Sequence, residues 1–192
     1  MKKYSIIIFV LLTFSSNLFA QWDLLSEEST LSFVSIKKGV VAEVSQFKQF
    51  KGMIDKKGEV SIAIDLSSVD TKIGIRDQRI KNKLFETSKY SHATLKGKVD
   101  LARAENMNVG EYYTDIVTLQ LSLHGVEKSV NSEVTIIKLN ENKWLVSSAK
   151  PVIINAADFS LVDGVNTLRS LAGLTSIAMA IPVTFELVFN QE

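Results

Sequence analysis

The clearest pattern in the chain is a strict alternation of large apolar residues with smaller or polar ones at residues 177–189. A period of two over this length predicts a strand with one face in the interior and one towards water. Pro182 falls on the opposite face and cannot donate a ladder hydrogen bond, so we expect an edge or a bulge there. The strand would extend about 40 Å. A barrel supplies partners of that length without leaving open edges.

Shorter alternating runs mark most of the remaining chain. The cleanest are 60–66 and 115–123, and other strand-like runs are 30–38, 40–50, 93–99, 129–139 and 143–149. Residues 75–85 instead predict a helix, a second short helix is expected near 165–172, and the polar residues 102–111 predict a loop. The pattern favours an all-β fold with minor α, an antiparallel β-barrel of about eight strands, with a two-sheet sandwich as the alternative.

The first twenty residues predict an export signal. Lys2 and Lys3 precede an apolar stretch at 6–12 that is too short to span a bilayer, and Ala20 supplies a small residue at the expected cleavage point. The sequence therefore predicts a signal peptide at 1–20, a single exported domain at 21–192, and no stable membrane anchor after cleavage. An uncleaved membrane anchor is the alternative.

Composition narrows the class of protein. The 192 residues are 46% hydrophobic and 22% charged, which is typical of a globular domain. Without Lys2 and Lys3, 20 of the 22 basic residues remain against 21 acidic ones, so the near-neutral surface gives no reason to expect nucleic acid as a partner. The chain has no cysteine, which excludes disulfides and thiolate nucleophiles. The oligomeric state stays open, with a homodimer as one option.

Candidate chemistry is sparse. Neither of the two histidines, His92 and His124, has a metal-ligand spacing, so we expect no metal site. No Gly-x-Ser-x-Gly occurs and no pair of carboxylates stands out, so we expect no catalytic residues. Arg76 and Arg79 belong to the predicted helix, where a structural role is the simpler explanation; the alternative is contact with an anionic head group at a barrel mouth.

Several segments resemble motifs of the YceI-like family. In chain order they are Phe50-x-Gly52, Arg76-Asp77-x-Arg79-x-x-Asn82-x-Leu84-Phe85, Lys89-Tyr90-Ser91-His92-Ala93-Thr94, Leu121-Ser122-Leu123-His124-Gly125-Val126-Glu127-Lys128 and Asp158-Phe159. Each motif is weak alone, but together they are fairly specific and cover about 22–190. Leu84 stands where the family has a first phenylalanine and Ser91 where it has proline, so the chain resembles a divergent branch.

The resemblance implies a periplasmic, lipocalin-like barrel that holds a long isoprenoid chain in an elongated tunnel. Under this hypothesis the protein is a non-enzymatic carrier of a polyisoprenoid, an isoprenoid quinone or a similar amphiphilic lipid, with no other cofactor. Arg76 and Arg79 are the expected head-group contacts. The expected lining residues are Phe33, Phe47, Phe85, Leu121, Leu123, Phe159, Met179, Ile181, Val183 and Phe185.

Two alternatives from other functional classes stay open. One is a stress-response or interaction module whose barrel interior is filled by its own side chains, and a cavity of roughly several hundred Å³ would argue against it. The other is a hydrolase or isomerase that acts on a lipid in the barrel. It requires His92 or His124 to lie in the cavity beside a carboxylate and act as a base.

Overall fold

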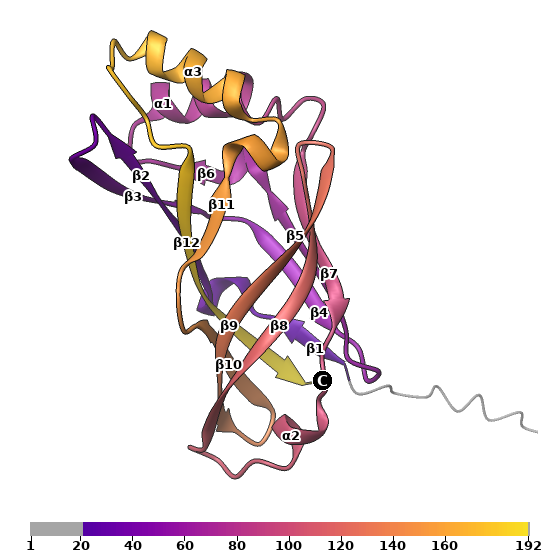
Figure 1. The fold of residues 1–192 in the computed structure, drawn as a ribbon. Coiled ribbons are helices and arrows are strands. Elements are labelled where there is room, and N and C mark those ends of the chain that lie inside the picture. Colours follow the sequence, from indigo (N-terminus) through magenta and orange to yellow (C-terminus); the bar gives the residue numbers. More distant parts are fainter. Residues whose placement is uncertain (1–20, 192) are drawn as a thin grey trace, which may run out of the picture.

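The computed structural model describes residues 21–191, which form a closed antiparallel β-barrel (Figure 1). The predicted signal peptide lies outside the described residues. The strands are β1 (Trp22–Leu24), β2 (Thr30–Lys37), β3 (Val41–Phe47), β4 (Phe50–Ile54), β5 (Glu59–Asp65), β6 (Val69–Asp70), β7 (His92–Lys98), β8 (Tyr112–Leu123), β9 (Val126–Asn140), β10 (Lys143–Ser148), β11 (Val152–Asn155) and β12 (Ala180–Gln191).

Some of these strands occur in pairs, and each pair forms the two halves of one longer barrel strand. A 3₁₀ turn, η1 (Ser26–Glu28), separates β1 from β2, and a second one, η2 (Leu66–Ser68), separates β5 from β6. Residues 48–49 separate β3 from β4, and 149–151 separate β10 from β11. The twelve strands therefore make eight barrel strands within the described range, which confirms the predicted barrel rather than the sandwich.

The barrel closes on β12. On one side this strand pairs with β11 and β10, and on the other with β2 and β1. Because β1 and β2 both pair with β12, the first and last strands of the barrel are joined, and β1 pairs with β4 on its other side. The alternation read from the sequence thus belongs to the strand that completes the fold.

The regular part of β12 begins later than the sequence predicts. It starts at Ala180, and Ile177 makes only an isolated bridge to Lys37 of β2. The next pair between these strands is Val183 with Phe33, so β12 covers the interval with two more residues than β2. Pro182 lies in this interval, and its missing N–H is consistent with an interrupted ladder at that point.

Two helical segments cover one end of the barrel (Figure 1). α1 (Gly74–Arg79) continues as a π-helical turn, η3 (Ile80–Leu84), and α3 (Val162–Leu171) packs against that turn. Both match the predicted helices closely. A Cβ atom on Gly164 would lie 2.8 Å from the carbonyl oxygen of Lys83, so glycine allows the close approach of α3 to η3.

The remaining helical segments are short. α2 (Ala102–Glu105) lies in the region predicted to be a loop, so that prediction was wrong over one turn. The Asp100 carboxylate accepts a hydrogen bond from the Ala102 N–H at 2.9 Å, which stabilises the start of the turn. A 3₁₀ turn, η4 (Ala156–Phe159), leads from β11 towards α3.

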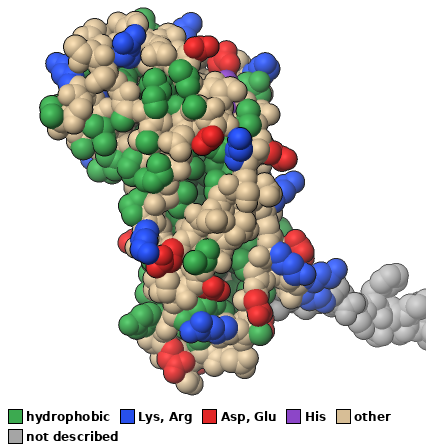
Figure 2. Space-filling model, in the orientation of Figure 1, with side chains coloured by type: hydrophobic (Ala, Val, Ile, Leu, Met, Phe, Trp, Pro, Cys, Tyr) green, Lys and Arg blue, Asp and Glu red, His purple; other side chains and the backbone are tan. Residues whose placement is uncertain are grey.

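Charged side chains are scattered along the barrel wall, while hydrophobic side chains gather near the end covered by α1 and α3 (Figure 2). Among the helices within 21–191, none has the length and apolar character needed to cross a bilayer.

Candidate functional site

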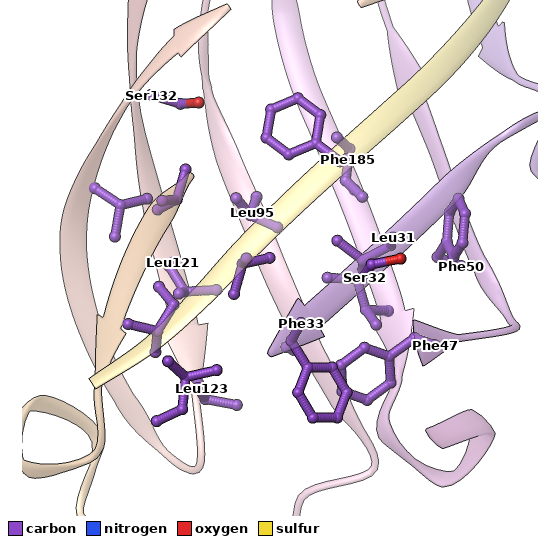
Figure 3. A pocket seen from close by; sticks show the side chains of 18 of the residues that line it. Leu31, Ser32, Phe33, Phe47, Phe50, Leu95, Leu121, Leu123, Ser132 and Phe185 are labelled. Carbon is purple, nitrogen blue, oxygen red and sulfur yellow. The ribbon is translucent and has the colours of Figure 1, made fainter. Parts of the chain in front are cut away.

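The interior of the barrel is hollow. A cavity of about 870 Å³ runs between the strands and under α1 and α3, and its walls are mostly aliphatic and aromatic. A cavity of this size falls in the range of ligand-binding sites rather than of packing defects. In Figure 3, side chains such as Phe185, Leu95 and Leu121 point into this space from different strands.

The inward face of β12 supplies one wall of the cavity along its whole length. From the start of the regular strand, every second residue lines it: Ile181, Val183, Phe185, Leu187 and Phe189. On the opposite face of the strand Thr184 and Glu186 are exposed, whereas Val188 near the C-terminal end is buried. The period of two therefore divides the strand into a cavity face and a solvent face.

Most of the residues predicted to line the cavity do so. They are Phe33, Phe47, Phe85, Leu121, Leu123, Ile181, Val183 and Phe185, together with both predicted head-group residues, Arg76 and Arg79. Phe33 and Phe47 lie beside each other with ring centroids 5.4 Å apart (Figure 3), and the Phe85 ring is 5.9 Å from that of Phe47. These rings form an aromatic wall below the helical cover.

The structure places two of the predicted residues elsewhere. Phe159, which is 2% exposed, belongs to η4 and packs in the solid core rather than on the cavity wall. Met179 precedes β12 and is half-buried against the core, while its neighbour Ala178 lines the cavity. For Met179 the reason is the irregular interval between Ile177 and Val183, which shifts the alternation before the regular strand begins.

A charged cluster stands at the helical end of the cavity. Lys37 of β2 and Arg76 of α1 both donate to the same carboxylate oxygen of Glu43 on β3. The hydrogen bond from Lys37, reinforced by Arg76, holds the pKa of Glu43 below its usual range despite an opposing effect of burial. Both cations line the cavity, so the cluster leaves a net positive charge at this end of it.

Arg79 completes this polar end from the next turn of the helix. Its Nη1 donates to the carbonyl oxygen of Leu171, at the end of α3, over 3.3 Å. Asp77, between the two arginines, has a different role. Its Oδ1 accepts from the N–H of Thr71 at 2.9 Å and from the Thr71 hydroxyl at 2.6 Å, and thereby fixes the chain that enters α1.

Sequence reasoning missed Lys37 and Glu43, although the alternation contains a signal for both. Phe33 faces the cavity, and residues 35 and 37 follow on the same face of β2. Glu43 is paired with Ser35 across the β2–β3 hairpin, so it shares that face. The prediction needed the hairpin register, and Gly39 marks its turn with a φ of 72°.

Two tryptophans form the opposite end of the cavity. Trp22 of β1 and Trp144 of β10 are 4% and 5% exposed and meet edge to face with an angle of 77° between ring planes. Lys138, also buried, holds its ammonium group 5.5 Å from the centre of the Trp144 ring and donates to the carbonyl oxygen of Met107 at 2.9 Å. These packed side chains of Trp22, Trp144 and Lys138 close this end of the barrel, and we call them the packed floor.

The cavity wall is thinner where β7 and β8 part. Their ladder runs only from Thr94 to Gly97 of β7, and beyond it the cavity is lined by exposed side chains such as Lys98 and Asp115. Burial raises the pKa of the Tyr113 hydroxyl in this region. Ser132 adds a polar atom to the wall, because its buried Oγ has no hydrogen-bond partner among the described residues (Figure 3).

Neither histidine lies in the cavity. His92 is exposed, and its ring contacts the Ser91 hydroxyl at 2.8 Å. His124 occupies the β8–β9 turn with a φ of 52°, and its Nε2 lies 3.1 Å from Glu86 on the outside of the barrel. Within 21–191, histidine, aspartate and glutamate residues form no cluster of three or more suited to a metal ion.

Comparison with known sequences gives one family. The model of the YceI-like domain matches residues 22–189, which is nearly all of the described chain. Among proteins with curated descriptions, none matches the sequence.

Solved structures agree with this match. A polyisoprenoid-binding domain from Saccharophagus degradans, implicated in plant cell wall breakdown, is 38% identical and superposes with a TM-score of 0.87, over 89% of this chain and 98% of that one. BcnA of Burkholderia cenocepacia is 20% identical with a TM-score of 0.64, over 86% and 99% of the two chains. A Campylobacter jejuni YceI protein is 19% identical with a TM-score of 0.51, over 77% and 84%. The last two likenesses concern the fold alone.

Proposed function

Because the chain belongs to the YceI-like domain family, we propose that it binds and carries a polyisoprenoid or a similar amphiphilic lipid in the periplasm, without catalysing a reaction on it. The observation that carries the proposal is the apolar cavity of about 870 Å³ inside a closed barrel. The lipid class is suggested by the relative from Saccharophagus degradans, and the compartment by the signal peptide predicted at 1–20.

The energetics favour a hydrocarbon ligand. Moving a chain out of water gains about 0.8 kcal/mol for each buried CH₂ group, so a long isoprenoid needs few polar contacts to bind well. The lining supplies apolar walls along most of the cavity and positive charge at the helical end, from Lys37, Arg76 and Arg79. This arrangement suits a lipid whose tail lies along the barrel and whose head reaches the charged cluster.

The two alternatives lack comparable support. A module with a filled interior conflicts with a cavity of this volume. A lipid-acting hydrolase or isomerase that uses His92 or His124 as a base conflicts with the positions of both rings, which do not line the cavity. Neither histidine can therefore reach a lipid bound there.

The direct test is extraction of protein purified from its native host, followed by mass spectrometry of the organic phase. We expect a co-purifying isoprenoid lipid. A protein that is empty on purification, and that also takes up no quinone or prenyl phosphate from detergent, would refute the proposal. N-terminal sequencing of the periplasmic fraction tests the compartment, and a mature chain that begins near Gln21 is the expected result.

A matched pair of variants connects the lipid to the cavity. Val183→Trp places a large ring in the hollow interior, whereas Thr184→Trp places the same ring on the solvent face of the same strand. We expect uptake of a quinone from detergent to fall at least about tenfold in Val183→Trp, because the ring occupies the volume needed by the tail, and to stay unchanged in Thr184→Trp. Equal uptake by both variants would place the lipid outside the barrel.

A further inference from the structure

Exposed apolar side chains surround the helical end of the cavity. We define the mouth rim as residues 37–43, 71–79 and 169–177, which come from the β2–β3 hairpin, the start of α1 and the end of α3. Its exposed apolar side chains, with their exposed fractions, are Val40 (84%), Ile75 (57%), Leu171 (47%), Ile73 (45%) and Val41 (44%). Ile73 and Ile75 also line the cavity, so the rim lies where the cavity meets the solvent.

Direct contacts join the three rim segments into a ring. Arg76 of α1 pairs with Glu43 of the hairpin, and Arg79 of α1 donates to the carbonyl oxygen of Leu171 at the end of α3. The N–H of Lys38, at the hairpin turn, donates to the carbonyl oxygen of Ser176 at 3.0 Å. The three segments that carry the apolar side chains are therefore held together at the helical end, near which hydrophobic groups gather in Figure 2.

The mouth rim also carries an excess of positive charge. Its ionisable side chains are Lys37, Lys38, Lys72, Arg76, Arg79, Arg169, Glu43 and Asp77, an excess of four positive charges, whereas the whole chain has a net charge of only +1. Glu43 and Asp77 are both engaged in contacts within the rim. The two exposed lysines, Lys38 and Lys72, stand directly beside Val40 and Ile73.

We propose that the mouth rim docks on the surface of a bilayer that contains anionic phospholipids, so that the cavity opens directly onto the membrane. Exposed apolar side chains next to several lysines and arginines are the two signals that together give interfacial binding. The inference rests on the proposed function: the transfer of a long hydrocarbon through bulk water is strongly unfavourable, and a docked mouth avoids that exposure.

A second copy of the chain suits this surface less well. A symmetric dimer would place the same basic patch of one protomer against that of its partner, and like charges across an interface are repulsive. The thin wall between β7 and β8 is a weaker candidate for lipid entry, because Lys98, Asp115 and Thr118 make its exposed lining mostly polar.

Flotation with lipid vesicles tests the proposal. The protein is mixed with vesicles of phosphatidylcholine alone or with added phosphatidylglycerol, and we expect binding mainly to the anionic vesicles. Val40→Glu should lower that binding about tenfold or more, because it removes an inserted apolar group and adds a repelled charge. Val109→Glu is the matched control, since Val109 is 52% exposed and lies outside the mouth rim. It should bind as the wild type does.

A second variant tests the charge separately. Lys38→Asn with Lys72→Asn keeps residues that tolerate the left-handed backbone at these positions, where φ is 51° and 61°. We expect about a thirtyfold loss of binding to anionic vesicles, and the wild-type binding should itself weaken as salt is raised. Circular dichroism of each variant controls for folding.

Lipid uptake from detergent separates this proposal from the proposed function. If the wild type takes up a quinone from detergent but does not float with anionic vesicles, docking is refuted and carriage stands. If the wild type floats with anionic vesicles but takes up no quinone from detergent, docking stands and carriage is refuted. Equal flotation of wild type and Val40→Glu, or a wild-type dimer that Val40→Glu dissociates in the absence of flotation, would also overturn the docking proposal.

Discussion

The two ends of the barrel are built from the same alternating strands but are finished in different ways. At one end Trp22 and Trp144 meet in the interior and leave no free space between them. At the other end helical segments lie across the opening, and the strands below them enclose a hollow. A barrel end can thus be filled by large side chains or covered by separate elements, and at the covered end the cavity meets the solvent beside Ile73 and Ile75.

The difference also concerns charge. Near the tryptophans the buried cation Lys138 is held by a backbone carbonyl and an aromatic ring, which are structural contacts. At the covered end Lys37 and Arg76 share the carboxylate of Glu43 beside the cavity. The first arrangement is enclosed in the core, whereas the second borders the cavity.

Removal of the packed floor should have the largest effect. Trp144→Ala deletes a ring that is 5% exposed, and we expect the free energy of unfolding to fall by about 3–5 kcal/mol in urea titrations. A loss below about 1 kcal/mol would mean that this end is as loosely packed as the other, and the comparison would fail.

Two truncations on one strand sharpen the contrast. Leu187 and Ile181 both face the cavity from β12, but Leu187 lies towards the tryptophans and Ile181 towards the helices. We expect Leu187→Ala to cost about 2–4 kcal/mol of unfolding free energy, as in a packed core. Ile181→Ala should cost less than about 2 kcal/mol, because one side of its side chain already borders empty space. Equal losses in urea titrations would contradict the contrast.

The helical cover can be tested through Gly164. Gly164→Ala brings a methyl group within 2.8 Å of the carbonyl oxygen of Lys83, so α3 must move away from η3. We expect a loss of about 1–3 kcal/mol of unfolding free energy and faster hydrogen exchange in both segments. Thr167→Ala, at an exposed position of the same helix, is the control and should change little. Unchanged exchange would show that the cover does not depend on this contact.

The smallest effect should come from Glu43. Its pKa is lowered in the folded state, so its ion pairs add stability above the pKa of the unfolded chain and lose it as the pH falls through the folded pKa. The wild type should exceed Glu43→Gln in unfolding free energy by at most about 1 kcal/mol at neutral pH, since the carboxylate is partly exposed. This difference should shrink at pH values below 4.5. A difference that grows on acidification would reverse the assigned sign.

Sequence alone predicted the barrel and most of the cavity wall, because both follow from the period of two. Alternation alone predicted that Ile181, Val183 and Phe185 share the interior face of the last strand, and the structure places them along the cavity. A helix was predicted at 75–85 from its helical pattern, and the structure has helical segments at 74–84. These features depend on neighbours in the chain, and local patterns report them well.

The remaining features depend on contacts between distant segments. The approach of α3 to η3 requires Gly164 opposite Lys83, and no local pattern indicates that pairing. The position of Met179 depends on where β12 becomes regular, which is set by its pairing with β2. Phe159 belongs to η4, a short turn outside the alternating strands. The Glu43 cluster likewise joins a hairpin to a helix 33 residues further along the chain.

The position of β12 has a consequence for how the molecule folds. Its C-terminal half binds strands from the beginning of the domain: Val188 donates to the Ser29 hydroxyl, 159 residues away in sequence, and accepts from the Leu25 N–H. Until those bonds form, β2 exposes an unpaired strand edge and its apolar face to the solvent. Such long-range pairing makes assembly slow compared with that of helical proteins, so the edge of β2 stays open until the last strand pairs with it.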